Sequence, residues 1–325
     1  MRGSAGHEAD TRTMVLVDRG AGGRRWPAWG AALAILLLVA VPTSAWSQRQ
    51  FETPDAAAKA LADAARANDV RRVGIILGIF GRNIVSSGDD VADANARAKF
   101  VAAYDAANRI VPDGDNKATL EIGKDNFPFP VPLAKDKDGW RFDTLAGQHE
   151  ILARRIGANE LNTIQVCLAY VEAQREYARL DPEKNGSPVY AQRVVSQPNK
   201  KDGLYWPASE GAPASPLGEF MAGAAGEGYR PGQSRIPYHG YYYKILRAQG
   251  PKAPGGAYDY VVRGRMIGGF ALVAYPAEYR NSGVMTFVVN HDGAVYQKDL
   301  GAGTAGIAGG MSSFNPDSTW KKVAP

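Results

Sequence analysis

The feature that most constrains the fold of this chain is a long helical pattern in its middle, over residues 147–180. Apolar side chains recur there at the three- and four-residue spacing that places them on one face of an α-helix: Leu161, Ile164, Leu168 and Val171. The pattern is weakened at Gly157 and ends at Asp181-Pro182, because proline cannot continue a helix. A helix this long needs a second element to cover its apolar face, so we expect a sheet to pack against it.

The chain before this helix predicts three shorter helices followed by short strands. Thr53 and Pro54 are the residue types of a helix N-cap and a first helical position. The predicted helices cover residues 56–67, 70–80 and 90–110, with a turn at 86–89, and the predicted strands cover residues 118–122, 127–133 and 139–143. The second strand contains three prolines, which place it at a sheet edge, because proline cannot donate to a central ladder.

The chain after the long helix predicts an irregular excursion and then an antiparallel meander. Residues 183–233 are rich in Gly, Pro and Ser, with one small helix at 217–225. Strands are predicted over residues 241–246, 258–263, 269–275, 284–290 and 294–298. The expected fold is α+β: cone-like helices plus a short antiparallel sheet form a domain over residues 48–146. A second domain over residues 147–325 then packs the long helix on a C-terminal antiparallel meander.

Residues 1–47 predict a signal peptide. Arg24-Arg25 precedes an apolar run over residues 26–41, and small residues follow, as in secretory signals. Cleavage after Ala45 and cleavage after Ser47 both fit this pattern. An uncleaved anchor is the alternative, although the run is shorter than the roughly 20 residues that span a bilayer. We therefore expect a periplasmic or secreted protein, which touches a membrane only if this segment is retained.

Composition excludes several classes of function. One cysteine and four histidines leave no material for a disulfide framework or a multi-cysteine metal site, so no metal and no cofactor is expected. The formal net charge of +5 is spread over dispersed basic pairs, whereas nucleic-acid binding needs a clustered basic face. We expect Cys167 to be a small buried hydrophobe rather than a nucleophile acting with His149. The G-x-G-x-x-G run at residues 301–306 lacks a dinucleotide-binding context and predicts a glycine-rich turn into a short helix. No catalytic residue is predicted.

The candidate binding residues are aromatic. The run of residues 238–243 places Tyr241 and Tyr243 on one face of a strand and Tyr242 on the other. We expect Tyr241 and Tyr243 to face the core, since Ile245 continues their face. The predicted binding residues are Tyr238, His239, Tyr242 and Trp206, whose rings suit a peptide, a glycan or another envelope protein. Ordinary sheet packing is the alternative.

Two parts of the chain resemble known folds. The helices and the short sheet that ends in residues 139–143 (GWRFD) resemble the nuclear transport factor 2-like superfamily, whose curved sheet and helices enclose a pocket. The residues expected to line such a pocket, or to fill it as a core, are Phe100, Tyr104, Trp140 and Phe142. The long helix, irregular segment and meander resemble the globular head of type IV pilins and pseudopilins. A pilin's helix begins at the mature N-terminus, whereas this helix begins far from it, which argues against assembly into a filament.

From residue 51 to about residue 323 the chain resembles a family of bacterial exported proteins, the domain of unknown function 2950. The stretches that carry this resemblance are residues 154–160 (RRIGANE), 202–207 (DGLYWP), 215–218 (SPLG), 265–270 (RMIGGF) and 284–287 (VMTF). The resemblance implies export and an unassigned role, and it supplies no catalytic residue.

Together these features predict an exported, non-catalytic cell-envelope protein that binds or helps to assemble a periplasmic partner. The alternative is an exported hydrolase or isomerase that uses a pocket in the N-terminal cone. The sequence leaves open the partner, the oligomeric state and the start of the chain at Met1 or Met14.

Overall fold

The first helix begins where its cap residues predict. The computed structural model describes residues 48–184, 186–211, 213–230 and 236–323. In it, the side chain of Thr53 accepts a hydrogen bond from the backbone N–H of Ala56 at 3.1 Å. The helices that follow are α1 (Pro54–Arg66), α2 (Val70–Leu77), the short η1 (Ile79–Gly81), α3 (Arg82–Val85) and α4 (Asp90–Ala106).

The predicted signal peptide, with Arg24-Arg25 and both cleavage positions, lies outside the described residues. Within the described residues, no helix combines the length and the apolar character needed to cross a membrane.

A small antiparallel sheet follows these helices. Its strands are β1 (Asn108–Pro112), β2 (Lys117–Ile122), β3 (Phe127–Pro128), β4 (Leu133–Asp136) and β5 (Gly139–Phe142), in the order β1-β2-β4-β5 with β3 paired to β2. The predicted helix over residues 90–110 was too long, because Ile110 pairs with Leu120 in the β1–β2 ladder. The core between helices and sheet is apolar and includes Leu61, Ile76, Leu133 and Phe142.

The long helix is α5 (Thr144–Leu180), which is continuous through Gly157. Its buried face differs from the predicted stripe, since Leu161 and Leu168 are exposed. From residue 159 onward its buried residues include polar side chains beside the apolar ones: Asn159, Thr163, Cys167, Tyr170, Val171, Gln174 and Tyr177. Gln174 shows why a polar residue is tolerated there: its side-chain amide donates to Ala191 O and accepts from Ala191 N, each at 2.8 Å.

The C-terminal part contains the main sheet, in the order β15-β13-β12-β11-β6. The strands are β6 (Tyr241–Leu246), β11 (Ala271–Pro276), β12 (Met285–Asn290), β13 (Val295–Asp299) and β15 (Lys321–Lys322), and every neighbouring pair is antiparallel. The predicted strand over residues 258–263 does not join this sheet. It breaks at Tyr260 into β8 (Tyr258–Asp259), which pairs with β7 (Ala248–Gln249), and β9 (Val261–Val262), which pairs with β10 (Arg265–Met266).

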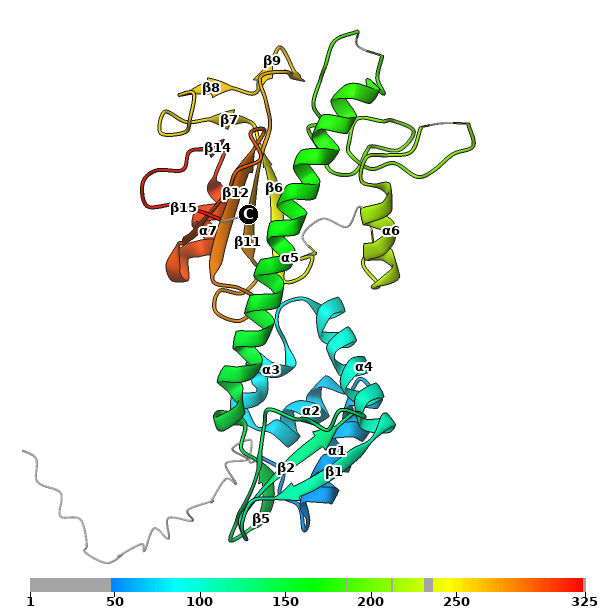
Figure 1. The fold of residues 1–325 in the computed structure, drawn as a ribbon, viewed down its shortest axis with the longest axis vertical. Coiled ribbons are helices and arrows are strands. Elements are labelled where there is room, and N and C mark those ends of the chain that lie inside the picture. Colours follow the sequence, from blue (N-terminus) through cyan, green and yellow to red (C-terminus); the bar gives the residue numbers. More distant parts are fainter. Residues whose placement is uncertain (1–47, 185, 212, 231–235, 324–325) are drawn as a thin grey trace, which may run out of the picture. The chain divides into compact units, whose positions relative to one another are not determined.

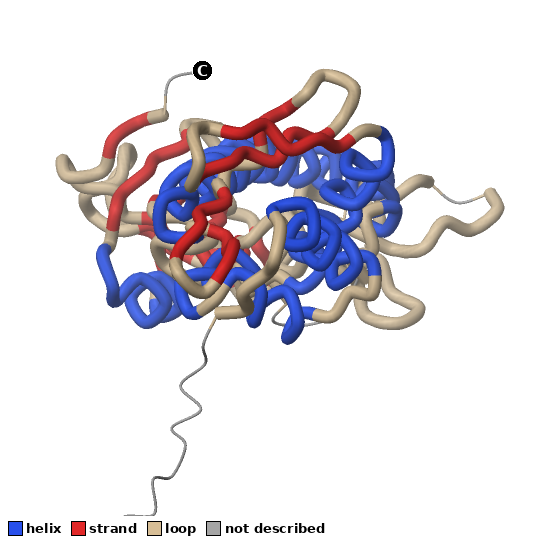
Figure 2. Tube along the Cα trace, turned by 90° about the horizontal axis from the view of Figure 1, so that it is seen from below, coloured by secondary structure: helices blue, strands red, loops and turns tan. Residues whose placement is uncertain are grey.

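Both faces of the main sheet are covered. Figure 1 shows α5, in green, running past β11 and β12, and α5 packs on both strands. The other face is covered by α7 (Thr304–Gly310), which packs on β11. The described loops between α5 and α6 (Gly218–Gly226) belong to the irregular excursion, and Figure 2 draws loops in tan.

This architecture confirms the α+β prediction with a long helix and a C-terminal antiparallel meander. The main apolar cluster of the C-terminal part is separate from the cluster under α1 and α2. The division into domains at residue 147 stays a prediction.

Candidate binding site: an aromatic cavity beside the long helix

A cavity of about 510 Å³ is bounded by α5, the irregular excursion, α6 and the start of β6. Its wall is mostly apolar and aromatic. Val166, Ala169 and Tyr170 come from α5, Phe220 and Met221 from α6, and Tyr242 and Tyr243 from β6. The rest of the wall includes Tyr229, Arg230, Tyr238, Leu272 and Tyr275.

Two of the predicted binding residues, Tyr238 and Tyr242, line this cavity. The half-buried ring of Tyr238 packs edge-on against Phe220 and Tyr229, with ring centroids 5.3 and 4.8 Å away. Burial raises the pKa of the Tyr238 phenol to about 12, so the phenol is uncharged at neutral pH. Tyr242 lies with its ring centroid 5.6 Å from that of Tyr275, its register partner on β11.

The other two predicted residues lie elsewhere. His239 is not among the lining residues of the cavity. Its ring centroid lies 4.2 Å from that of Tyr238, and its Nε2 atom lies 3.2 Å from the carboxylate of Glu227. Trp206 is buried in the core of the irregular excursion, where its Nε1 donates to Pro213 O at 3.2 Å and its ring packs against Tyr177. The structure therefore brings Tyr238, His239 and Tyr242 together and leaves Trp206 apart from them.

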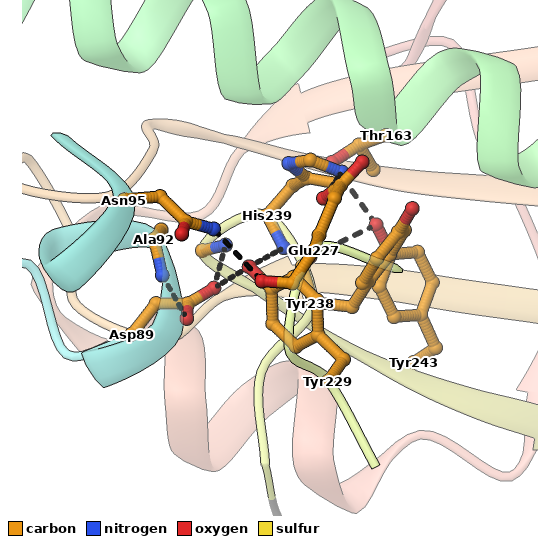
Figure 3. A network of polar contacts seen from close by, with 10 residues as sticks. Asp89, Ala92, Asn95, Thr163, Glu227, Tyr229, Tyr238, His239 and Tyr243 are labelled. Carbon is orange, nitrogen blue, oxygen red and sulfur yellow. Dashed lines mark hydrogen bonds and ion pairs between the residues drawn. The ribbon is translucent and has the colours of Figure 1, made fainter. Parts of the chain in front are cut away.

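A polar network that the sequence did not predict fixes the wall of the cavity (Figure 3). The carboxylate of Asp89 is fully buried and accepts three hydrogen bonds, from Ala92 N at 3.0 Å, Tyr229 Oη at 2.9 Å and Gly240 N at 2.9 Å. The first of these caps α4. The other two hold the segments on either side of Tyr238. Burial, followed by the adjacent Asp89 carboxylate, raises the pKa of the Tyr229 phenol, which therefore remains a donor.

Tyr243 forms the part of the wall nearest α5. Its hydroxyl lies 3.4 Å from Thr163 Oγ1 and 3.4 Å from the backbone oxygen of Tyr238 (Figure 3). Burial raises the pKa of Tyr243 well above its ordinary value. Tyr241 is fully buried on the same face and donates to Met285 O at 3.0 Å. The alternation along β6 thus places Tyr241 and Tyr243 toward α5 and Tyr242 away from it, as expected.

The described lining residues include no carboxylate and no histidine, and Arg230 is their one charged side chain. No cluster of three or more metal-ligating side chains occurs among the described residues. The cavity can therefore accept an apolar or aromatic group, but its described wall offers no general acid–base pair.

The predicted pocket residues of the N-terminal part pack against neighbouring rings. The ring of Phe100 lies 6.2 Å from that of Tyr104 and 5.2 Å from that of Phe129, which in turn lies 6.1 Å from Phe142. Trp140 packs against the same apolar cluster. All four residues pack in or against the apolar clusters of the N-terminal part.

Cys167 is fully buried, and burial raises the pKa of its thiol to about 12. Since α5 is continuous, the 18 positions between His149 and Cys167 correspond to about 27 Å along the helix. The cysteine is a packing residue, as predicted. The glycine-rich run at residues 301–306 forms η2 (Gly301–Gly303) and the start of α7, which is the predicted turn into a short helix.

The fold and the cavity define an α+β protein with an aromatic site between its long helix and its main sheet. The chain belongs to the family described as "Protein of unknown function (DUF2950)", whose model matches residues 48–323. No curated protein and no solved structure matches the chain. The resemblances to the nuclear transport factor 2-like fold and to a pilin head stay predictions.

The structure gives one of the family-like stretches, residues 154–160, a role in joining elements. Arg155 donates to Asn83 O and Ile84 O at the end of α3, at 2.6 and 2.5 Å. Asn159 donates to Ser282 O at 2.8 Å, and Glu160 accepts from the backbone N–H groups of residues 284 and 285 at 2.9 and 3.0 Å. One turn and a half of α5 therefore binds both α3 and the chain that enters β12.

Proposed function

We propose that the protein is a non-catalytic binding protein of the cell envelope, and that the aromatic cavity takes apolar side chains from a peptide segment of its partner. The observation that carries this proposal is the wall itself. It encloses about 510 Å³ and is lined by aliphatic and aromatic side chains. Ligand sites are commonly of this size, about 300–1,000 Å³, and of this apolar character.

Two of the phenols in the wall already form hydrogen bonds within the protein, which favours a peptide over a glycan. Each sugar hydroxyl that enters a cavity needs a hydrogen-bond partner, because burying it without one is costly. The phenol of Tyr229 already bonds Asp89. The phenol of Tyr243 already bonds Thr163 and the backbone oxygen of Tyr238. Apolar side chains need no such partners and gain from leaving water.

Binding is tested with N-phenyl-1-naphthylamine, an uncharged apolar fluorophore, and with two competitors. We expect the fluorophore to bind saturably, a capped Leu-Phe-Leu peptide to displace it, and chitotriose to leave it bound. Displacement by chitotriose but not by the peptide contradicts the proposed partner, and absence of saturable binding contradicts the site.

A matched pair of variants locates the binding. Ala169 lines the cavity from α5, whereas Ala158 is exposed on the same helix. Ala169→Phe fills the cavity and should weaken fluorophore binding at least about tenfold, a free-energy change of about 1.4 kcal/mol. Ala158→Phe adds the same ring outside the cavity and should leave binding unchanged. Equal effects of the two variants would rule out the cavity as the binding site.

Export is the second part of the proposal and rests on the predicted signal peptide over residues 1–47. N-terminal sequencing of the protein from an envelope fraction should return a chain that starts after Ala45 or after Ser47. An intact Arg24-Arg25 segment would instead show a retained anchor. Recovery of the protein only from the cytoplasmic fraction would contradict export.

A further inference from the structure

We infer that a second cavity, formed where the irregular excursion meets β10, is a binding site for an oxyanion, a carboxylate or phosphoryl group. This cavity has a volume of about 320 Å³ and shares no lining residue with the aromatic cavity. Three arginines, Arg193, Arg247 and Arg265, line it. The inference does not depend on the proposed function.

The guanidinium of Arg265 has a donor without an acceptor. Its Nε atom is buried and has no hydrogen-bond partner, whereas a second nitrogen donates to Ser187 Oγ at 2.9 Å. A buried donor is normally paired, and a bound ion or water molecule is a common partner for one that the protein leaves unpaired. Arginine presents its nitrogens as a planar fork that matches the two oxygens of a carboxylate or phosphate.

Arg247 is held in the same wall by a neutral partner. It donates to Gln192 Oε1 at 2.7 Å, and the amide nitrogen of Gln192 donates to Gly264 O, next to Arg265, at 2.7 Å. Gln192 therefore orients Arg247 without neutralising it. Among the described ion pairs, neither Arg247 nor Arg265 has a carboxylate partner.

The acidic side chains of the wall do not cancel this charge. Asp202 forms an ion pair with Arg193 at 3.6 Å and also accepts a hydrogen bond from Gln197 N at 2.8 Å. Its negative charge is therefore paired with Arg193 and not with Arg247 or Arg265. Glu183 is the other carboxylate. Three guanidinium groups against two carboxylates leave one positive charge in excess, which favours an anionic ligand.

Isothermal titration of the full protein with sodium phosphate, sodium succinate and sodium chloride tests the site. We expect saturable binding of phosphate or succinate and none of chloride at equal ionic strength. The phosphate and succinate arms distinguish a phosphoryl ligand from a carboxylate ligand. Absence of saturable binding in both arms overturns the inference.

Variants locate the anion. Arg265→Gln and Arg247→Gln should each weaken binding at least about tenfold, because each removes one guanidinium from the cavity. Arg71→Gln, on the exposed surface of α2, makes the same change of net charge and should leave the affinity unchanged. Equal weakening in all three variants would indicate a nonspecific charge effect and overturn the assignment.

Arg265→Lys tests geometry apart from charge and guards against a variant that fails to fold. It keeps the positive charge and loses the planar fork. We expect a folded protein, by circular dichroism, with weaker anion binding. Undiminished affinity in a folded Arg265→Lys protein would contradict recognition by the Arg265 fork.

Discussion

The phenol of Tyr229 donates a hydrogen bond of 2.9 Å to the buried carboxylate of Asp89, and so joins two positions that lie 140 residues apart in the chain (Figure 3). Asp89 also caps α4 and accepts from Gly240 N. One carboxylate thereby fixes the start of a helix in the N-terminal part and the segment that carries Tyr238 into the aromatic cavity.

Tyr229→Phe removes this bond and leaves the ring in place. Hydrogen bonds to charged groups contribute about 1.5–3 kcal/mol, and we expect the free energy of unfolding to fall by about that amount in urea denaturation. Tyr279→Phe is the control, since its hydroxyl bonds the exposed Asp299 at 3.1 Å. It should change stability by about 0.5 kcal/mol or less. Similar losses in both variants would show that burial of Asp89 adds nothing to the bond.

Arg155 and Arg154 are neighbours on α5 with opposite environments. Arg155 is half-buried and donates hydrogen bonds to Asn83 O, Ile84 O and Asn281 Oδ1. Arg155→Ala leaves these acceptors without their donor and should destabilise the protein by about 2–4 kcal/mol. Arg154 forms an exposed ion pair with Glu150, and Arg154→Ala should cost about 1 kcal/mol or less. Thermal unfolding of the two variants gives the comparison, and equal shifts would contradict the anchoring role of Arg155.

Gly240 lies at φ +75° between α5 and the turn before β12, where an added Cβ would stand 2.5 Å from Asn159 Nδ2 and 2.9 Å from Ser282 Cβ. Gly240→Ala should therefore destabilise by about 2 kcal/mol or more, from backbone strain and overlap together. Gly256 has a similar φ of +79° but no atom within 4 Å of its added Cβ. Gly256→Ala should show the backbone strain alone, about 1 kcal/mol. Denaturation midpoints of the two variants separate these effects.

Cys167 makes stability depend on pH in the alkaline range. Its thiol has a pKa of about 12 in the folded chain, against an ordinary value of 9.0. The unfolded state therefore releases a proton that the folded state retains, so stability falls as pH rises above about 9. Between pH 9 and pH 10 this linkage amounts to about 1 kcal/mol.

Cys167→Ser removes that contribution, because serine does not ionise in this range. At pH 7 we expect the variant to be about 1–2 kcal/mol less stable, since a hydroxyl replaces the thiol at a fully buried site. The deficit should shrink by about 1 kcal/mol between pH 9 and pH 10. Parallel stability curves for the two proteins would contradict the raised thiol pKa.

Alanine substitutions of the tyrosines of β6 should lower stability by different amounts, depending on the face of the strand that carries the ring. Tyr241 is fully buried, and Tyr241→Ala should cost about 3–5 kcal/mol, enough to prevent folding of a marginal domain. Tyr242 is only half-buried and lines the cavity. Tyr242→Ala should fold with a smaller loss of melting temperature and weaken fluorophore binding. Equal small shifts for both variants would show that neither ring belongs to the core.

Local sequence signals predicted several elements closely. Thr53 marks the start of α1, and the alternation over residues 241–246 matches the bounds of β6. The same kind of signal failed at Ile110, whose apolar neighbours fit a helix as well as a strand. Ile110 is in a strand because it pairs with Leu120. The periodicity of neighbouring residues does not reveal such a partner, because the partner lies in another strand.

The predicted strand over residues 258–263 failed for a related reason. Its alternation is present in the sequence, but Tyr260 is fully buried and donates to Gln249 Oε1 at 2.9 Å, where the strand breaks. The predicted apolar stripe of α5 was also displaced, since Thr163 and Gln174 are buried while Leu161 is exposed. Buried polar side chains are stable only where distant partners satisfy them, so periodicity alone underestimates such positions.

The sequence by itself determined the α+β class, the long central helix, four of the five predicted meander strands and two of the aromatic residues that line the cavity. These follow from caps, periodicity and alternation, which act over a few neighbouring residues. The tertiary structure alone decided that Asp89 meets Tyr229, that Trp206 is a core residue and that Arg247 and Arg265 share a cavity. Such contacts join residues far apart in the chain, and they form only when the packing of whole elements brings the side chains within hydrogen-bond or van der Waals distance.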